Sequence, residues 1–127
     1  MDITKKITSF ETACEDQGLN PSDLPIVNHL PEWMQQSIID YYKLSVIIRS
    51  LNEGWVPNFN DWNEDKYFNF FYANFGAAAG VGCVDSKRVP SSTSTILGSR
   101  LCFKTRKLAI YAAEKFEALY RSYLLLS

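Results

Sequence analysis

One stretch of eighteen consecutive residues without a charge, Tyr67–Val84, constrains the fold more than any other part of the sequence. Its length is close to the minimum for a helix that spans a membrane. However, it contains Asn69, Asn74 and several glycines, and its first half is rich in Phe and Tyr. Aromatic residues favour a β-strand over a helix. We therefore predict a strand over residues 67–74, a glycine-rich segment after it, and no membrane span.

Apolar and polar residues alternate in a later segment, residues 95–104. A period of two is typical of a strand with one buried face. It places Leu97, Leu101 and Phe103 toward the interior and the cations Arg100 and Lys104 toward the solvent. The simplest arrangement is an antiparallel β-hairpin of residues 67–74 and 95–104, with residues 75–90 as its long glycine-rich tip.

Helical patterns flank these two predicted strands. Thr8 and Glu11 resemble a capping box, and Gly18 suits the left-handed position that ends a helix. A second helix is expected from Pro31 to Gly54, because its apolar residues recur at spacings of three and four. A last helix is expected after Thr105, which suits an N-cap. The predicted fold is therefore α+β: two N-terminal helices, the hairpin, and a C-terminal helix packed on the sheet. We expect residues 1–127 to form one domain.

Composition supports a packed domain and excludes a uniformly basic one. Hydrophobic residues are 46% and aromatic residues 14% of the chain, so a substantial core is expected. The net charge is −1, but residues 1–75 sum to −6 and residues 76–127 to +5. This asymmetry permits an anionic partner at the basic end, although it is also compatible with ordinary solvated faces.

The sequence carries no motif for catalysis, a cofactor or a metal. His29 is the one histidine and has no nucleophile motif around it. The three cysteines are too widely spaced for a metal or redox motif. Residues 76–82 contain glycines but lack the lysine of a phosphate-binding loop, and the acidic residues of 61–65 lack the spacing of a calcium loop. We therefore expect a protein that is not an enzyme and has no cofactor.

Several short motifs resemble those of a family of small proteins encoded by phages and prophages of gut bacteria. They are Asn52-Glu53-Gly54-Trp55-x-Pro57, Asp61-Trp62-Asn63, Lys66-Tyr67 and Gly98-Ser99-Arg100-Leu101-Cys102-Phe103-Lys104. Shorter matches around Ala13, Leu44 and residues 109–120 extend the resemblance over most of the chain. The family has no established activity, so the resemblance implies a context: a phage or prophage gene expressed in a bacterial cytoplasm, with association with the virion as an alternative.

The predicted contact surface combines the loop after the second helix with the basic end of the second strand. Its residues are Trp55, Trp62, Lys66, Tyr67, Arg100, Lys104 and Arg106. The leading hypothesis is an accessory protein that binds a host or viral protein. The alternative is a module that binds single-stranded nucleic acid or a nucleotide, because aromatic rings beside cations can stack bases and hold phosphates. A homodimer is a further expectation.

Overall fold

The computed structural model describes residues 2–61, 63–74, 80–88 and 98–124 of the chain, with the backbone alone described for 70–74 and 80–88. Within these residues five helices and a pair of strands follow one another. The helices are α1 (Ile3–Lys6), α2 (Phe10–Gln17), α3 (Glu32–Leu51), α4 (Arg106–Lys115) and α5 (Glu117–Leu124). The strands are β1 (Tyr67–Asn74) and β2 (Gly80–Arg88), and η1 (Ser99–Leu101) is a short 3-10 helix.

The predicted α+β fold with a hairpin of residues 67–74 and 95–104 is wrong. Helices dominate the described part of the chain, and β1 pairs with β2, which lies in the segment expected to be the hairpin tip. Gly98 has φ 84° and ψ 162°, which interrupts an extended strand, and η1 follows it directly. Within the described residues, the predicted pairing survives as a single antiparallel bridge between Tyr67 and Phe103.

The alternation of apolar residues in 95–104 predicted a strand, but a turn can produce the same alternation. Leu101 and Phe103 are buried as expected, but Cys102 between them is buried as well, with 2% of its surface exposed. Leu97 lies outside the described residues. The segment from Arg100 to Lys104 is therefore a turn with an apolar underside, and its two cations do not share the face of a strand.

The helix boundaries follow local sequence signals closely. Gly18 has φ 69° and ends α2, as predicted. The capping box at the start of α2 is made by Ser9 and Thr12 instead of Thr8 and Glu11. The predicted last helix is divided into α4 and α5, because Phe116 departs from helical geometry with ψ 29°. Thr105 caps α4 through a hydrogen bond from the Leu108 N–H.

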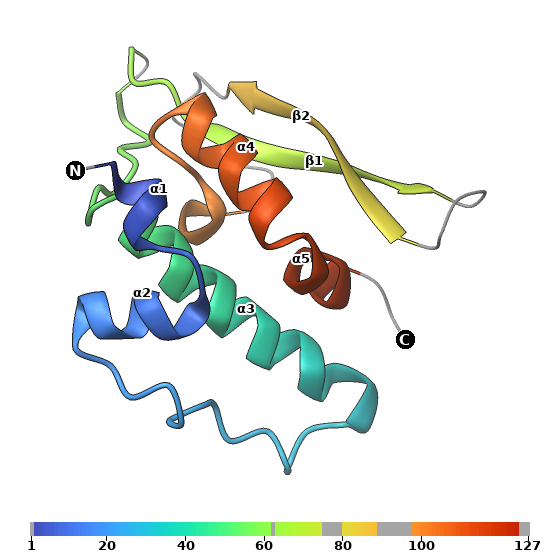
Figure 1. Ribbon diagram of the computed structural model, residues 1–127. Coiled ribbons are helices and arrows are strands. Elements are labelled where there is room, and N and C mark those ends of the chain that lie inside the picture. The colour runs from blue at the N-terminus through green and yellow to red at the C-terminus, as the bar shows by residue number, and fades with distance from the viewer. Residues whose placement is uncertain (1, 62, 75–79, 89–97, 125–127) are drawn as a thin grey trace.

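The helices and strands lie in layers (Figure 1). Helices α4 and α5 lie between α3 and the strand pair, with α5 in contact with α3 and both α4 and α5 in contact with β2. Asn69 of β1 is 3% exposed, and its Nδ2 donates to the Ala109 carbonyl at 2.9 Å. This buried bond fixes β1 against α4. The hydrophobic core joins α2, α3, η1, α4 and α5 through residues such as Leu44, Leu101 and Leu108.

Candidate binding cleft

A cleft of about 350 Å³ opens where the C-terminal half of α3 meets the turn at residues 55–57 and η1. Arg49 of α3, Trp55 and Val56 of the turn, and Ser99 and Arg100 of η1 line it. The cleft therefore joins parts of the chain that lie about 50 residues apart in sequence, since Asn52 bonds to Cys102. It brings together two arginines and a tryptophan.

The end of α3 is shaped by two consecutive residues with positive φ. Glu53 has φ 53° and Gly54 has φ 81°. The Gly54 N–H donates to the Arg49 carbonyl and the Glu53 N–H to the Ser50 carbonyl, which is the bonding pattern of a Schellman motif. A glycine usually takes the position of Glu53, because a side chain disfavours that conformation. This reversal turns the chain so that Trp55 faces the last turns of α3.

Asn52 fixes η1 to the end of α3. It is 3% exposed, its Nδ2 donates to the Cys102 carbonyl at 2.8 Å, and its Oδ1 accepts from the Lys104 N–H at 3.0 Å. The Asn52 side chain thus pairs with backbone groups on both sides of Phe103, as a neighbouring strand would. Arg100 lies two residues before this clamp, so Asn52 sets where the arginine stands relative to α3.

The cleft is rich in hydrogen-bond donors. Arg49 and Arg100 are both exposed, and neither forms an ion pair with another residue of the described ranges. Among the described residues, no Asp or Glu lines the cleft. The Trp55 indole N–H and two guanidinium groups can only donate. The unpaired groups therefore suit a ligand that carries negative charge and acceptor oxygens.

Two other polar side chains of the wall donate hydrogen bonds within the protein. The Gln17 Nε2 donates to the Val46 carbonyl at 2.7 Å and to the Ser50 Oγ at 2.6 Å. The Ser45 hydroxyl donates to the Tyr41 carbonyl. The two bonds of Gln17 hold α2 and α3 together, and the Ser45 bond lies within α3, so these donors are not offered to a ligand.

In comparisons with known proteins, no protein-family model, curated protein or solved structure matched the chain. The family suggested by the sequence motifs therefore stays a prediction.

Two of the predicted contact residues, Trp55 and Arg100, come together in the cleft. Trp55 is half-buried, whereas its neighbour Val56 is 62% exposed. Trp62 lies outside the described residues. The sequence prediction missed Arg49 and Asn52. Both stand at the end of the predicted second helix, where Arg49 is the one cation of the last turn and Asn52 opens the Asn-Glu-Gly-Trp motif.

Lys66, another predicted contact residue, is fully buried. Its exposed fraction is 0%, and its Nζ donates to the carbonyls of Asp61 and Glu64 at 3.2 and 3.1 Å. The same Nζ lies 3.4 Å from a Glu64 carboxylate oxygen and 5.3 Å from the centre of the Phe59 ring. The buried Lys66 side chain therefore stabilises the loop before β1 by binding its backbone carbonyls.

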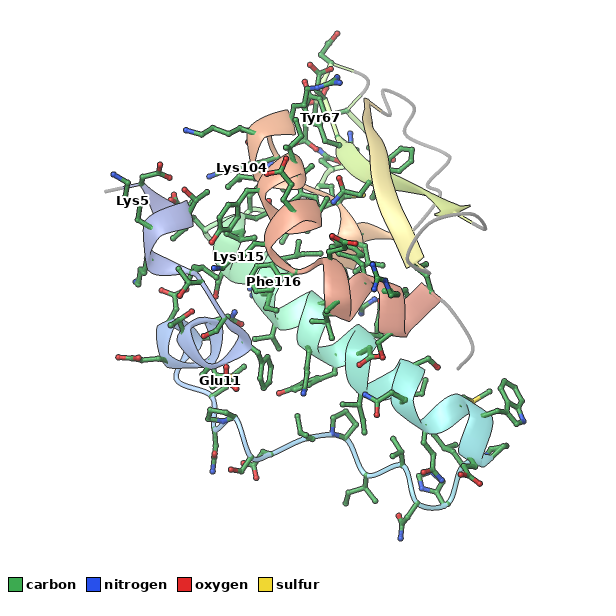
Figure 2. The ribbon with its side chains drawn as sticks, turned by 45° about the vertical axis from the view of Figure 1, so that its right-hand side comes forward. Lys5, Glu11, Tyr67, Lys104, Lys115 and Phe116 are labelled. Atoms are coloured by element: carbon green, nitrogen blue, oxygen red, sulfur yellow. The ribbon has the colours of Figure 1, made fainter. Side chains whose placement is uncertain are left out.

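Three other predicted contact residues lie beside the cleft or away from it. Tyr67 is half-buried and exchanges backbone hydrogen bonds with Phe103 at 3.0 and 2.7 Å. Lys104 follows near the start of α4 (Figure 2), and its Nζ lies 3.6 Å from the Glu53 carboxylate. Arg106 is exposed on the first turn of α4 and has a partner of its own. Glu53 therefore compensates Lys104 and leaves the cleft arginines uncompensated.

The other chemistry considered from the sequence does not gather at the cleft. His29 is exposed in the segment before α3. The acidic residues of the loop bind its own backbone: Glu64 accepts from the Asn58 N–H and Asp61 from the Asn63 N–H. In the part of the chain that the structure describes, no cluster of three or more His, Cys, Asp or Glu residues is arranged to hold a metal ion. None of the helices described there has the length and apolar character needed to cross a membrane.

Proposed function

We propose that this protein is a non-catalytic accessory protein of a phage or prophage, acting in the bacterial cytoplasm by binding a host or viral protein at the cleft. The partner contributes a segment that carries a carboxylate and an apolar side chain. The observation that carries the proposal is the presence of two exposed arginines, unpaired within the described residues, beside Trp55 and Val56. Tryptophan and arginine are the residues most enriched among those that dominate protein-binding energy.

Each part of the cleft has a counterpart in such a segment. A guanidinium group binds a carboxylate with two parallel hydrogen bonds, which fixes direction as well as affinity. Val56 is 62% exposed and Trp55 half-buried, so an apolar side chain placed there would lose contact with water. The absence of Asp and Glu from the described lining removes the repulsion that an acidic segment would otherwise meet.

A protein partner fits this arrangement better than a single-stranded nucleic acid does. Nucleic-acid binding requires a row of cations along the phosphate backbone, with aromatic rings on which bases stack. The predicted row of Arg100 and Lys104 on one strand is not formed, and Lys104 is compensated by Glu53. Two arginines at one compact cleft suit one or two carboxylates instead.

The experiment is a titration of the ¹⁵N-labelled protein with a short peptide rich in Asp, Glu and Leu, followed through the Trp55 indole and Arg100 backbone signals. We expect both signals to shift, and Arg49→Gln and Arg100→Gln each to weaken binding roughly tenfold, the loss of one charged hydrogen-bonding partner. Lys115→Gln is the matched control. It removes one positive charge from the exposed face of α4 (Figure 2), so it should leave the affinity unchanged.

Two results would overturn the proposal. The first is peptide binding that is equally strong in both arginine variants, because the cleft would then not be the site. The second is tighter binding of a thymidine oligonucleotide than of the peptide, with an affinity that falls steeply as salt rises. That outcome would establish the nucleic-acid alternative.

A further inference from the structure

A long stretch near the N-terminus contains acidic residues and no basic ones. Residues 7–42 contain six Asp and Glu residues and no Lys or Arg. Five large apolar side chains within this stretch are exposed: Leu19, Leu24, Ile26, Trp33 and Ile38. Exposed apolar side chains that gather on one face commonly mark a protein–protein contact.

One of the two most exposed of these apolar residues lies next to an acidic residue. Trp33 is 67% exposed, and Glu32, which directly precedes it at the start of α3, is exposed as well. We call these two residues the tail face. It offers a carboxylate and a large apolar group together, which is the combination that the cleft can bind.

The tail face and the cleft lie at opposite ends of α3. Glu32 and Trp33 begin this helix of 20 residues, whereas Arg49 and Asn52 end it. At 1.5 Å per residue the two ends are about 30 Å apart. Figure 1 shows the segment before α3 running to the end of the helix that lies away from η1. One molecule therefore cannot place its own tail face in its own cleft.

We propose that the cleft of one molecule binds the tail face of a second copy of this chain, so that molecules associate head to tail. The inference rests on the proposed function of the cleft and names one partner for it. Glu32 supplies a carboxylate to the cleft arginines, and Trp33 covers Val56. Because the two surfaces differ, each head-to-tail pair keeps one free cleft and one free tail face, and the assembly extends or closes into a ring.

Sedimentation velocity of the full-length protein over a concentration series tests this. We expect the average mass to rise beyond that of a dimer with concentration, and to fall when salt is raised from about 0.1 M to about 1 M, which screens the charge pairs. A cleft variant, Arg49→Glu with Arg100→Glu, and a tail variant, Trp33→Ser, should each be monomeric. A second tail variant, Glu32→Lys, keeps Trp33 and replaces the first if the first unfolds.

Mixing the two kinds of variant decides between modes of association. The cleft variant retains a tail face and the tail variant retains a cleft, so their equimolar mixture should form a 1:1 dimer that does not grow. A wild-type protein that stays monomeric at all concentrations would overturn the inference. So would a dimer that persists in each variant alone, as a homodimer through α5 would. The acidic peptide separates the two proposals. Peptide binding without self-association refutes only the head-to-tail contact. If the protein neither binds the peptide nor self-associates, the proposed binding role of the cleft is refuted as well.

Discussion

The strongest single test of the fold around the cleft is Asn52→Ala. The Asn52 side chain is 3% exposed and forms two hydrogen bonds, at 2.8 Å to the Cys102 carbonyl and at 3.0 Å from the Lys104 N–H. Alanine removes both bonds and leaves a small void. A buried polar group that loses its partner costs about 1–3 kcal/mol, and water can replace part of the loss at the half-buried Lys104. We therefore expect a loss of about 3 kcal/mol.

Urea denaturation followed by circular dichroism measures this loss. For a denaturant slope of about 2 kcal/mol per molar, the midpoint should fall by about 1.5 M. Asn28→Ala is the matched control, because Asn28 is exposed and forms no side-chain hydrogen bond with the described residues. Its free energy of unfolding should stay within about 0.5 kcal/mol of that of the wild type.

A second variant separates the two bonds of Asn52. Asn52→Asp keeps the acceptor for the Lys104 N–H but replaces the donor to the Cys102 carbonyl with a second acceptor. We expect it to lose at least as much stability as the alanine variant near neutral pH, because a carboxylate then faces a carbonyl. If Asn52→Ala lost less than about 1 kcal/mol, the clamp between α3 and η1 would not be a main support of the fold.

Three further variants test the loop, the turn and the N-terminus by the same denaturation assay. Lys66→Met should cost about 2 kcal/mol, because it leaves the carboxylate of Glu64 without its buried cation, and an unchanged midpoint would contradict that account. Gly98→Ala should cost about 1–3 kcal/mol through the backbone alone, since a Cβ would have open space there; a neutral result would mean that the positive φ carries no strain. The hydrogen bond from Lys6 lowers the pKa of Asp16 below 3.8, so its stabilisation is present at neutral pH and lost as pH falls through that lowered value. Asp16→Asn should therefore be less stable than the wild type at pH 7 and equal to it in strong acid, and a difference that persists in acid would show another cause.

The helices could be predicted from the sequence because their signals are local. The spacing of Leu44, Ile47, Ile48 and Leu51 fits one helical face, and all four side chains are buried in the core. Gly18 ends α2 in the left-handed conformation that only glycine takes without strain. Such signals need no knowledge of distant residues, so they hold whatever the rest of the chain does.

The strand pairing could not be predicted because it depends on distant partners. Residues 80–88 contain glycines and charged residues, which disfavour a strand, yet they pair with the aromatic strand β1 along its whole length. Residues 98–103 carry the apolar alternation of a strand, yet Gly98 directs them into η1. Strand propensity reflects the surface on which a segment packs more than the segment itself.

The candidate site was predicted only in part for a related reason. Exposure separates contact residues from structural ones, and it is decided by tertiary packing. Lys66 and Arg100 are both cations of the predicted contact surface, yet one is fully buried and the other is exposed. Arg49 was missed because a cation in the last turn of a helix is common for electrostatic reasons alone.

The end of α3 supports the fold and the cleft with the same few residues, and this decides which substitutions can test binding. Asn52 anchors η1, and Glu53 with Gly54 turns the chain toward Trp55. A binding defect in an Asn52 variant would follow from a displaced η1 whether or not the residue touches a partner. Arg49 and Arg100 are exposed and bear no ion pair among the described residues, so their removal should leave the denaturation midpoint unchanged. An Arg100→Gln variant that keeps its midpoint and loses affinity therefore reports on contact, whereas one that loses both assigns the arginine to the fold.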